Sequence, residues 1–221
     1  MKILIVSATA KENGLTCSEL SKGIVARIKE PFKHDVDALV TGVGAVPTTF
    51  FLTRAIDGYQ LVINIGIAGS FKPDYPLGSV VCVKEDAFGD YGIDERGTFR
   101  SLAESNLLAK EEFPFHGDTL VNPWLRDKFI EVNLPMVRGV TLSTASGSEE
   151  RIKGIKKYWN ADIETMESAS VFYVCNLLGV KFVCLRAISN LIEPRDRSKW
   201  EFEKAVNSLT AEVRKIINGI S

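Results

Sequence analysis

The sequence predicts an α/β fold in which helices sandwich a largely parallel or mixed β-sheet. Two observations lead to this prediction: apolar, β-branched runs recur along the chain, and helical patterns lie between most of them. The 221 residues are 45% hydrophobic and 25% charged, which is typical of a globular protein with a real core. No repeat, low-complexity tract or linker interrupts the chain, so we expect residues 1–221 to form a single domain.

The apolar runs have the length of strands and lack the strict alternation of half-exposed strands, which indicates burial on both faces. The predicted strands are 2–7, 35–43, 60–68, 79–84, 137–143 and 181–188.

Three segments have helical spacing. Apolar residues about one turn apart predict a helix over 15–29, and an apolar stripe predicts another over 202–217. A third helix is predicted over 164–178 and ends at Gly179, a good stop signal. Residues 86–122 mix aromatic, glycine and acidic residues without a period, and such a long connection is more often a functional or interface loop than filler.

Charge and cysteine usage exclude several classes of function. The formal net charge is −1 with basic residues scattered among acids, which argues against a nucleic-acid or anionic-membrane surface. The four cysteines form no CxxC pair and no zinc-like set, so we expect free thiols, no metal site and a reducing compartment. The apolar run at residues 1–6 is too short for the core of a signal peptide, and no apolar run approaches the length of a membrane span. We therefore expect a cytoplasmic protein.

Open α/β sheets bind ligands at the carboxyl ends of their strands, which directs attention to the residues after each apolar run. One such segment, Gly66–Ser70, is rich in small residues that let backbone N–H groups approach a ligand. It matches neither GxGxxG nor GxxxxGK[ST], so it indicates neither a dinucleotide nor a Walker-type triphosphate site. A plain turn is the alternative interpretation.

Four polar side chains near strand ends are candidate functional groups. Glu167 precedes small or apolar residues, which suggests a partly buried carboxylate that needs a partner such as vicinal sugar hydroxyls. Glu164 is explained by a favourable charge–dipole position at a helix start. Glu12 fits an exposed loop acid equally well, and Asn190 fits a turn former. Each signal is weak alone, and the argument depends on their order along the chain.

That order resembles the nucleoside phosphorylase and nucleosidase superfamily, which contains methylthioadenosine/S-adenosylhomocysteine nucleosidase. The similarity extends from Ile3 to the last helix and rests on Glu12, Gly66–Gly69, Ser146-Gly147, Met166-Glu167 and Arg186–Ser189. The resemblance implies a three-layer α/β/α fold with a central mixed sheet. It also implies a small-molecule nucleoside substrate, no cofactor, and a homodimer or larger homo-oligomer.

The resemblance also implies roles for individual residues. Glu12 would orient and deprotonate an attacking water. Glu167 would hold the ribose 2′- and 3′-hydroxyls while Met166 packs beneath the sugar. Asn190 would contact N7 and the 6-substituent of the leaving purine. The remaining substrate-binding residues expected from the glycine-rich motif are Ile67, Ala68 and Gly69.

Two departures from the family pattern narrow the predicted reaction. Adenine-cleaving members carry Asp in the place of Asn190. An asparagine cannot act as a general acid, but it can donate to a 6-oxo group and accept from the N7–H that forms as the base departs. Phosphorolytic members carry Arg in the place of Asn64, and without this guanidinium phosphate binding would be weak. The sequence therefore favours hydrolysis of a 6-oxopurine nucleoside.

Within the superfamily, the runs Phe88–Gly92 and Ser189–Arg197 resemble the futalosine hydrolases of menaquinone biosynthesis. This resemblance implies cleavage of futalosine to hypoxanthine and dehypoxanthine futalosine. The 5′ end of that substrate carries a 3-carboxybenzoyl group.

The 5′ group suggests further contacts. We hypothesise that Arg195 or Arg197 pairs with its carboxylate, and that Phe88 or Tyr91 lines an aromatic channel. The alternative is that both arginines form surface ion pairs with neighbouring acids. The aromatic residue that packs on the base in adenine-cleaving relatives has no counterpart near Ser146-Gly147, so the stacking partner stays open.

Three other functions remain as alternatives. A methylthioadenosine or adenosylhomocysteine nucleosidase is disfavoured by Asn190, and an inosine or guanosine phosphorylase is disfavoured by Asn64. A non-catalytic nucleoside-binding protein is disfavoured because Glu12 and Glu167 are both present.

Overall fold

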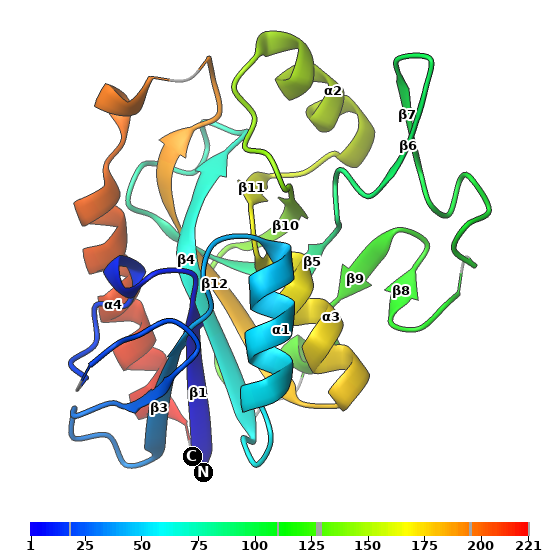
Figure 1. Ribbon diagram of the computed structural model, residues 1–221. Helices are drawn as coiled ribbons and strands as arrows, with labels where there is room; N and C mark the ends of the chain where they lie inside the picture. Colours follow the sequence, from blue (N-terminus) through cyan, green and yellow to red (C-terminus); the bar gives the residue numbers. More distant parts are fainter. Residues whose placement is uncertain (18, 110, 127–129, 195, 221) are drawn as a thin grey trace.

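The computed structural model describes residues 1–17, 19–109, 111–126, 130–194 and 196–220. They form the predicted mixed α/β fold around a central mixed sheet (Figure 1). The sheet runs in the order β2 (Val25–Arg27), β3 (Asp35–Val40), β1 (Lys2–Ser7), β4 (Leu61–Ser70), β11 (Ile163–Thr165), β10 (Met136–Thr141), β5 (Val80–Asp86), β9 (Thr119–Val121) and β8 (Phe115–His116), and β12 (Lys181–Leu191) pairs with both β4 and β5. All six predicted strands are confirmed.

Strand pairing closes part of this sheet on itself. β4 pairs with β12, β12 with β5, β5 with β10, β10 with β11, and β11 with the last residues of β4. One consequence is that Gly69 of β4 lies between two neighbours, Glu164 of β11 on one side and Asn190 of β12 on the other. The closure therefore gathers three strand ends that are far apart in the sequence.

Helices cover both faces of the sheet (Figure 1). Helices α1 (Ala45–Ala55) and α3 (Ser168–Leu178) pack on one face, and α4 (Phe202–Gly219) packs on the other. Alternate residues of β1 serve the two cores: Leu4 belongs to the cluster under α1 and α3, and Ile5 to the cluster under α4. A smaller cluster holds α2 (Glu149–Trp159) against β10 and the residue after it, Leu142. Short 3-10 helices are η1 (Ala10–Glu12), η2 (Pro123–Arg126) and η3 (Arg197–Lys199).

The helix predicted over 15–29 is wrong. The described residues of this segment run along the sheet edge, with β2 paired to β3 and isolated bridges from Cys17 to Ile28 and from Lys22 to Val40. Leu15 and Ile28 do face one core, as an amphipathic stripe would. The edge of β3 offers backbone hydrogen bonds, however, and Gly23 at φ +77° places a left-handed turn inside the segment.

The helix predicted over 164–178 ends correctly but begins too early. Gly179 has φ +64° and closes α3 in the left-handed conformation. At the other end, residues 163–165 form β11, and the helix begins only at Ser168. The first two residues of the predicted helix, Glu164 and Thr165, are therefore part of the sheet.

The long segment 86–122 contains a two-stranded hairpin, β6 (Gly92–Glu95) with β7 (Thr98–Ser101), which projects from the body of the protein (Figure 1). Cys82, Cys175 and Cys184 are buried free thiols, as predicted, and Cys17 is a half-buried one. In the described part of the chain, none of the helices has the length and apolarity that a membrane span requires.

Replacing Leu209 by Ala tests the packing of α4. The Leu209 side chain is fully buried in the core beneath α4, so the substitution leaves a cavity. We expect the free energy of unfolding, measured by urea titration, to fall by about 2–5 kcal/mol. The exposed Asn207→Ala control on the same helix should change it by no more than about 0.5 kcal/mol. Equal effects of the two substitutions would contradict the packing described here.

Candidate active site

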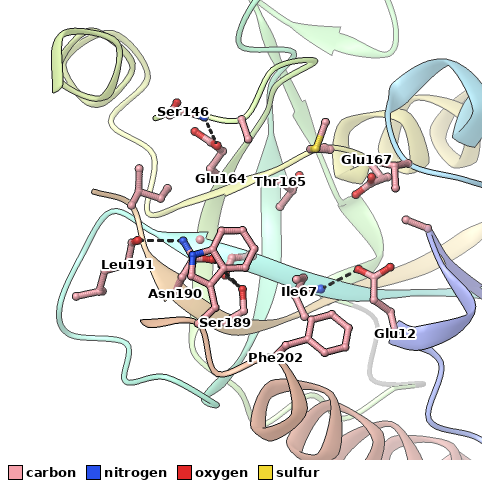
Figure 2. A pocket seen from close by; sticks show the side chains of 18 of the residues that line it. Glu12, Ile67, Ser146, Glu164, Thr165, Glu167, Ser189, Asn190, Leu191 and Phe202 are labelled. Carbon is pink, nitrogen blue, oxygen red and sulfur yellow. Dashed lines mark hydrogen bonds between the residues drawn. The ribbon is translucent and has the colours of Figure 1, made fainter. Parts of the chain in front are cut away.

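A cavity of about 310 Å³ opens at the carboxyl ends of β1, β4, β11 and β12. It contains seven residues that the sequence singled out as catalytic or substrate-binding: Glu12, Ile67, Ala68, Gly69, Met166, Glu167 and Asn190. Figure 2 shows Glu12 and Glu167 facing each other at one end and Asn190 toward the other. Residues 66–69 do not form a turn, because β4 continues through them to Ser70.

Glu12 lies in η1, directly after β1, and exposes only 7% of its surface. Its Oε2 accepts hydrogen bonds from the backbone N–H of Thr9 at 2.9 Å and from the Thr9 hydroxyl at 2.8 Å. Its Oε1 accepts from the N–H of Ile67 at 3.3 Å. A Cβ on Gly66 would lie 3.1 Å from Oε1, so glycine leaves room for the carboxylate. The exposed-loop alternative for Glu12 therefore does not apply.

Glu167 lies between β11 and α3 and is also buried, at 9% exposure. Its Oε1 accepts from the backbone N–H of Gly44 at 2.9 Å, which ties it to the loop before α1. Burial raises the pKa of Glu167; Arg186 opposes that rise and the nearby Glu12 adds to it. The carboxylates of Glu12 and Glu167 therefore lie at the same end of the cavity, close enough to interact electrostatically.

Arg186 is a fully buried arginine in β12, beneath this end of the cavity. Its Nη2 donates to Asn64 Oδ1 at 2.6 Å and its Nη1 to the Leu185 carbonyl at 2.8 Å. Its Cζ and Nε lie 3.6 Å from the position that a Cβ on Gly66 would occupy. Arg186 belongs to the Arg186–Ser189 motif, but the sequence did not predict a role for its side chain. A charged residue inside an apolar strand was the signal that could have found it.

Asn64 is buried in β4 and does not reach the cavity lining. Its side-chain N–H donates to the Val6 carbonyl at 2.9 Å, and its oxygen accepts from Arg186. It therefore fixes the buried guanidinium by hydrogen bonds.

Asn190 lies at the end of β12 and is half-buried. Its Nδ2 donates to the Leu191 carbonyl and its Oδ1 accepts from the Ser189 hydroxyl, both at 2.9 Å. A side-chain amide has two N–H donors and two acceptor lone pairs, so these bonds leave one of each for a ligand. A Cβ on Gly69 would lie 3.2 Å from Asn190 Nδ2, so the glycine makes room for this side chain.

Glu164 corrects the sequence interpretation. It is not at a helix start but in β11, exposes 8% of its surface, and lines the cavity. Its Oε1 accepts from the backbone N–H of Ser146 at 2.8 Å, as Figure 2 shows. Burial raises the pKa of Glu164.

Three aromatic or basic residues expected at the substrate are not among the described residues that line the cavity. Phe88 packs edge-on against Tyr91 and Tyr173 and contacts the core under α1 and α3. Tyr91 and Arg197 are exposed. Arg195 lies outside the described residues. Among the described residues, Glu193 forms an ion pair with Lys199, at 2.7 Å.

Two aromatic side chains that the sequence did not single out line the cavity: Trp200, which follows η3, and Phe202, which begins α4. Figure 2 shows the Phe202 ring beneath the cavity, near Ile67 and Ser189. Both come from the segment that joins β12 to α4.

Asp86 lies behind the cavity wall and is fully buried. Its Oδ1 accepts from the Thr141 hydroxyl at 2.9 Å, and that hydroxyl lies 3.0 Å from the hydroxyl of the cavity residue Thr165. Burial raises the pKa of Asp86 to about 7, against the opposing effects of Thr141 and Arg186.

The chain matches curated proteins along most of its length. It is 28% identical to the futalosine hydrolase of Thermus thermophilus over 81% of this chain and 80% of that protein. It is 30% identical to the futalosine hydrolase of Streptomyces coelicolor over 81% of this chain and 77% of that protein.

Solved structures share the fold. A methylthioadenosine/S-adenosylhomocysteine nucleosidase from Helicobacter pylori, in complex with a pyrrolidine ligand, superposes with a TM-score of 0.77 at 18% identity. The superposition covers 98% of this chain and 97% of that one. The futalosine hydrolase of Helicobacter pylori superposes with a TM-score of 0.71 at 22% identity, over 98% and 97% of the two chains.

The family model and the curated relatives together identify the chain as an N-glycosyl hydrolase of the nucleosidase type. The chain belongs to the Phosphorylase superfamily, whose family model matches residues 21–220.

The raised pKa of Asp86 predicts a pH dependence of stability. A carboxyl group that ionises near pH 4 when unfolded and near pH 7 when folded binds its proton more tightly in the folded state. The free energy of unfolding should therefore fall as pH rises from about 4 to about 7. In Asp86→Asn this fall should be smaller, measured by urea titration at several pH values across that range. The exposed Asp57→Asn control should keep the wild-type profile, and a D86N profile that also matches wild type would contradict the assignment.

Proposed function

We propose that this protein hydrolyses the N-glycosidic bond of futalosine and releases hypoxanthine and dehypoxanthine futalosine. The observation that carries the proposal is an amide, Asn190, at one end of a cavity whose other end holds two buried carboxylates. Similarity to two futalosine hydrolases across most of the chain supports the same substrate.

The proposed reaction develops positive charge on the ribose as electrons move into the purine. Glu12 takes a proton from a water held on the face of the sugar opposite the base. Glu167 accepts hydrogen bonds from the 2′- and 3′-hydroxyls and favours the positive sugar, while Met166 packs against it. Asn190 donates to the departing base and accepts from its N7–H. No metal or cofactor takes part in these steps.

Charge at the nucleophile end supports water over phosphate. Glu12 and Glu167 are both acidic, and a phosphate between them would meet like charges. Arg186 is fully buried, lies outside the cavity lining, and donates from both Nη atoms to protein oxygens. Among the described residues that line the cavity, Lys199 is the one with a positive charge, and it pairs with Glu193.

We place the 5′ carboxybenzoyl group of the substrate beside the segment between β12 and α4. Asp196, Lys199, Trp200 and Phe202 line the cavity there, and the two aromatic side chains supply an apolar wall. Arg195 and Arg197 flank Asp196 in the sequence, so both remain candidates for the substrate carboxylate. We assign the stacking partner of the purine to the same segment, at Trp200 or Phe202.

The proposed enzyme is a cytoplasmic, single-domain protein that works as a homodimer or larger homo-oligomer. An exposed apolar strip beside the cavity supports the assembly. Val43, which lines the cavity, exposes 55% of its surface, and Val46 and Phe50 of α1 expose 81% and 53%. Exposed apolar side chains gathered in this way are typical of protein interfaces.

Incubation of the protein with futalosine, inosine and methylthioadenosine, each with and without phosphate, tests the proposal. We expect hypoxanthine from futalosine at a rate that does not depend on phosphate, measured by chromatography of the free base. Release of adenine from methylthioadenosine with no cleavage of futalosine would overturn it.

Replacing Glu12 by Gln tests the role of the buried carboxylate. The amide cannot take a proton from water, so kcat should fall by about 10²–10⁴-fold with little change in the affinity for hypoxanthine. The exposed Glu19→Gln control should keep the wild-type kcat in the same steady-state assay. A Glu12→Gln enzyme with more than a tenth of the wild-type kcat would contradict the proposed role.

A further inference from the structure

Glu164 carries a buried oxygen that the mechanism above does not use. Its Oε1 accepts from the N–H of Ser146, but its Oε2 is buried and has no hydrogen-bond partner among the described residues. Arg151 lies close enough to lower the pKa of Glu164, yet its Nη2 donates to the Thr144 carbonyl at 3.0 Å. A buried carboxylate oxygen without a donor is costly, so its place in a ligand cavity indicates a donor on the ligand.

The sheet places Glu164 at the base end of the cavity. Glu164 and Asn190 are the register partners of Gly69 from its two sides, Asn190 following a β-bulge, and both side chains line the same cavity. Strands two positions apart lie about 10 Å apart, which leaves room for one planar base between the two side chains. Gly69 adds no side chain there. In Figure 2, Glu164 and Asn190 lie on opposite sides of the cavity, away from Glu12 and Glu167.

Asn190 favours a 6-oxopurine as leaving group because an amide cannot protonate N7, but it does not by itself exclude binding of a 6-aminopurine. A side-chain amide pairs bidentately with N6 and N7 of adenine, by accepting from the amine and donating to N7. Selection between 6-oxo and 6-amino bases therefore needs a second group that contacts another edge. The two bases differ at N1, where a 6-oxopurine carries an N–H donor and a 6-aminopurine carries a lone pair.

We propose that Glu164 accepts a hydrogen bond from N1–H of a 6-oxopurine and thereby selects hypoxanthine against adenine. The inference rests on the proposed function, because it assumes that the cavity holds a purine with Asn190 at its N7 edge. With adenine, the N1 lone pair faces the carboxylate and Oε2 stays without a donor. A hydrogen bond to a charged group distinguishes the bases by about 10- to 100-fold.

The test is the affinity of the free bases, measured by isothermal titration calorimetry on the full chain. The proteins are wild type, Glu164→Gln, Glu164→Ala and the exposed control Glu150→Gln. Wild type and the control should bind hypoxanthine about 10- to 100-fold more tightly than adenine. In Glu164→Gln this ratio should fall at least about tenfold, because an amide can also donate to N1 of adenine. An unchanged ratio in Glu164→Gln would overturn the proposal.

A change in the ligand provides a second test that needs no variant. 1-Methylhypoxanthine lacks the N1–H, so wild type should bind it at least about tenfold more weakly than hypoxanthine. Glu164→Ala, which has room for the methyl group, should bind the two bases with similar affinity. Equal affinity of wild type for both bases would overturn the role of Glu164.

Futalosine cleavage by the same wild-type preparation separates this inference from the proposed substrate. Cleavage of futalosine together with an unchanged base ratio in Glu164→Gln would contradict only the role of Glu164. A Glu164-dependent preference for hypoxanthine without cleavage of futalosine would support that role and contradict only the substrate.

Discussion

The backbone of β4 pairs with β12 from Leu61 to Ser70, with β1 over residues 61–64, and with β11 at its last two residues. The position of the candidate groups follows from this pairing. β1 leads into the short helix that ends at Glu12. Glu164 lies in β11 and Glu167 follows this strand, whereas Arg186 and Asn190 lie in β12. β4 supplies the floor, where Gly66 leaves room for the Glu12 carboxylate and Gly69 for the Asn190 amide. A side chain at either glycine would press on a group that we place at the substrate.

Buried charge is the second constraint on this part of the molecule. Glu12, Glu164, Glu167 and Asp86 are all nearly inaccessible to solvent, and Arg186 lies below them. Burial raises the pKa of Asp86, Glu164 and Glu167, because removal from water disfavours the charged form of a carboxyl group. Ligand hydroxyls and N–H groups are suitable partners for the two of these that reach the cavity. The same excess of acid opposes an anionic nucleophile and is consistent with water.

Periodicity predicted the parts of the fold that depend on burial. The six apolar runs form strands whose two faces are buried in the cores on either side of the sheet, and the stripe over 202–217 forms α4, whose apolar face packs on one side of the sheet. The helix prediction over residues 15–29 failed because the spacing of apolar residues alone does not distinguish a helix from an extended segment at a sheet edge. The residues at 15–29 have an amphipathic pattern but lie beside the free edge of β3, whose backbone groups give the segment its hydrogen bonds.

Residues of the site were predictable where a family motif covered them, as for Glu12, Glu167 and Asn190. Glu164 was misassigned because the helix was predicted to begin too early, which placed this residue of β11 in a first helical turn. An acidic side chain there is explained by the helix dipole, so no ligand contact was expected. Trp200 and Phe202 belong to a segment whose approach to the cavity depends on how α4 folds back across the sheet. No local pattern contains that information.

The central claim, that the acidic end of the cavity activates water, is tested most directly by isotopic labelling. A single turnover with futalosine in oxygen-18 water, in the presence of phosphate, should place the heavy oxygen on the sugar carbon released from the purine. Mass spectrometry of the products reads this out. The account predicts labelled dehypoxanthine futalosine and unlabelled phosphate, whereas an unlabelled sugar 1-phosphate would contradict it.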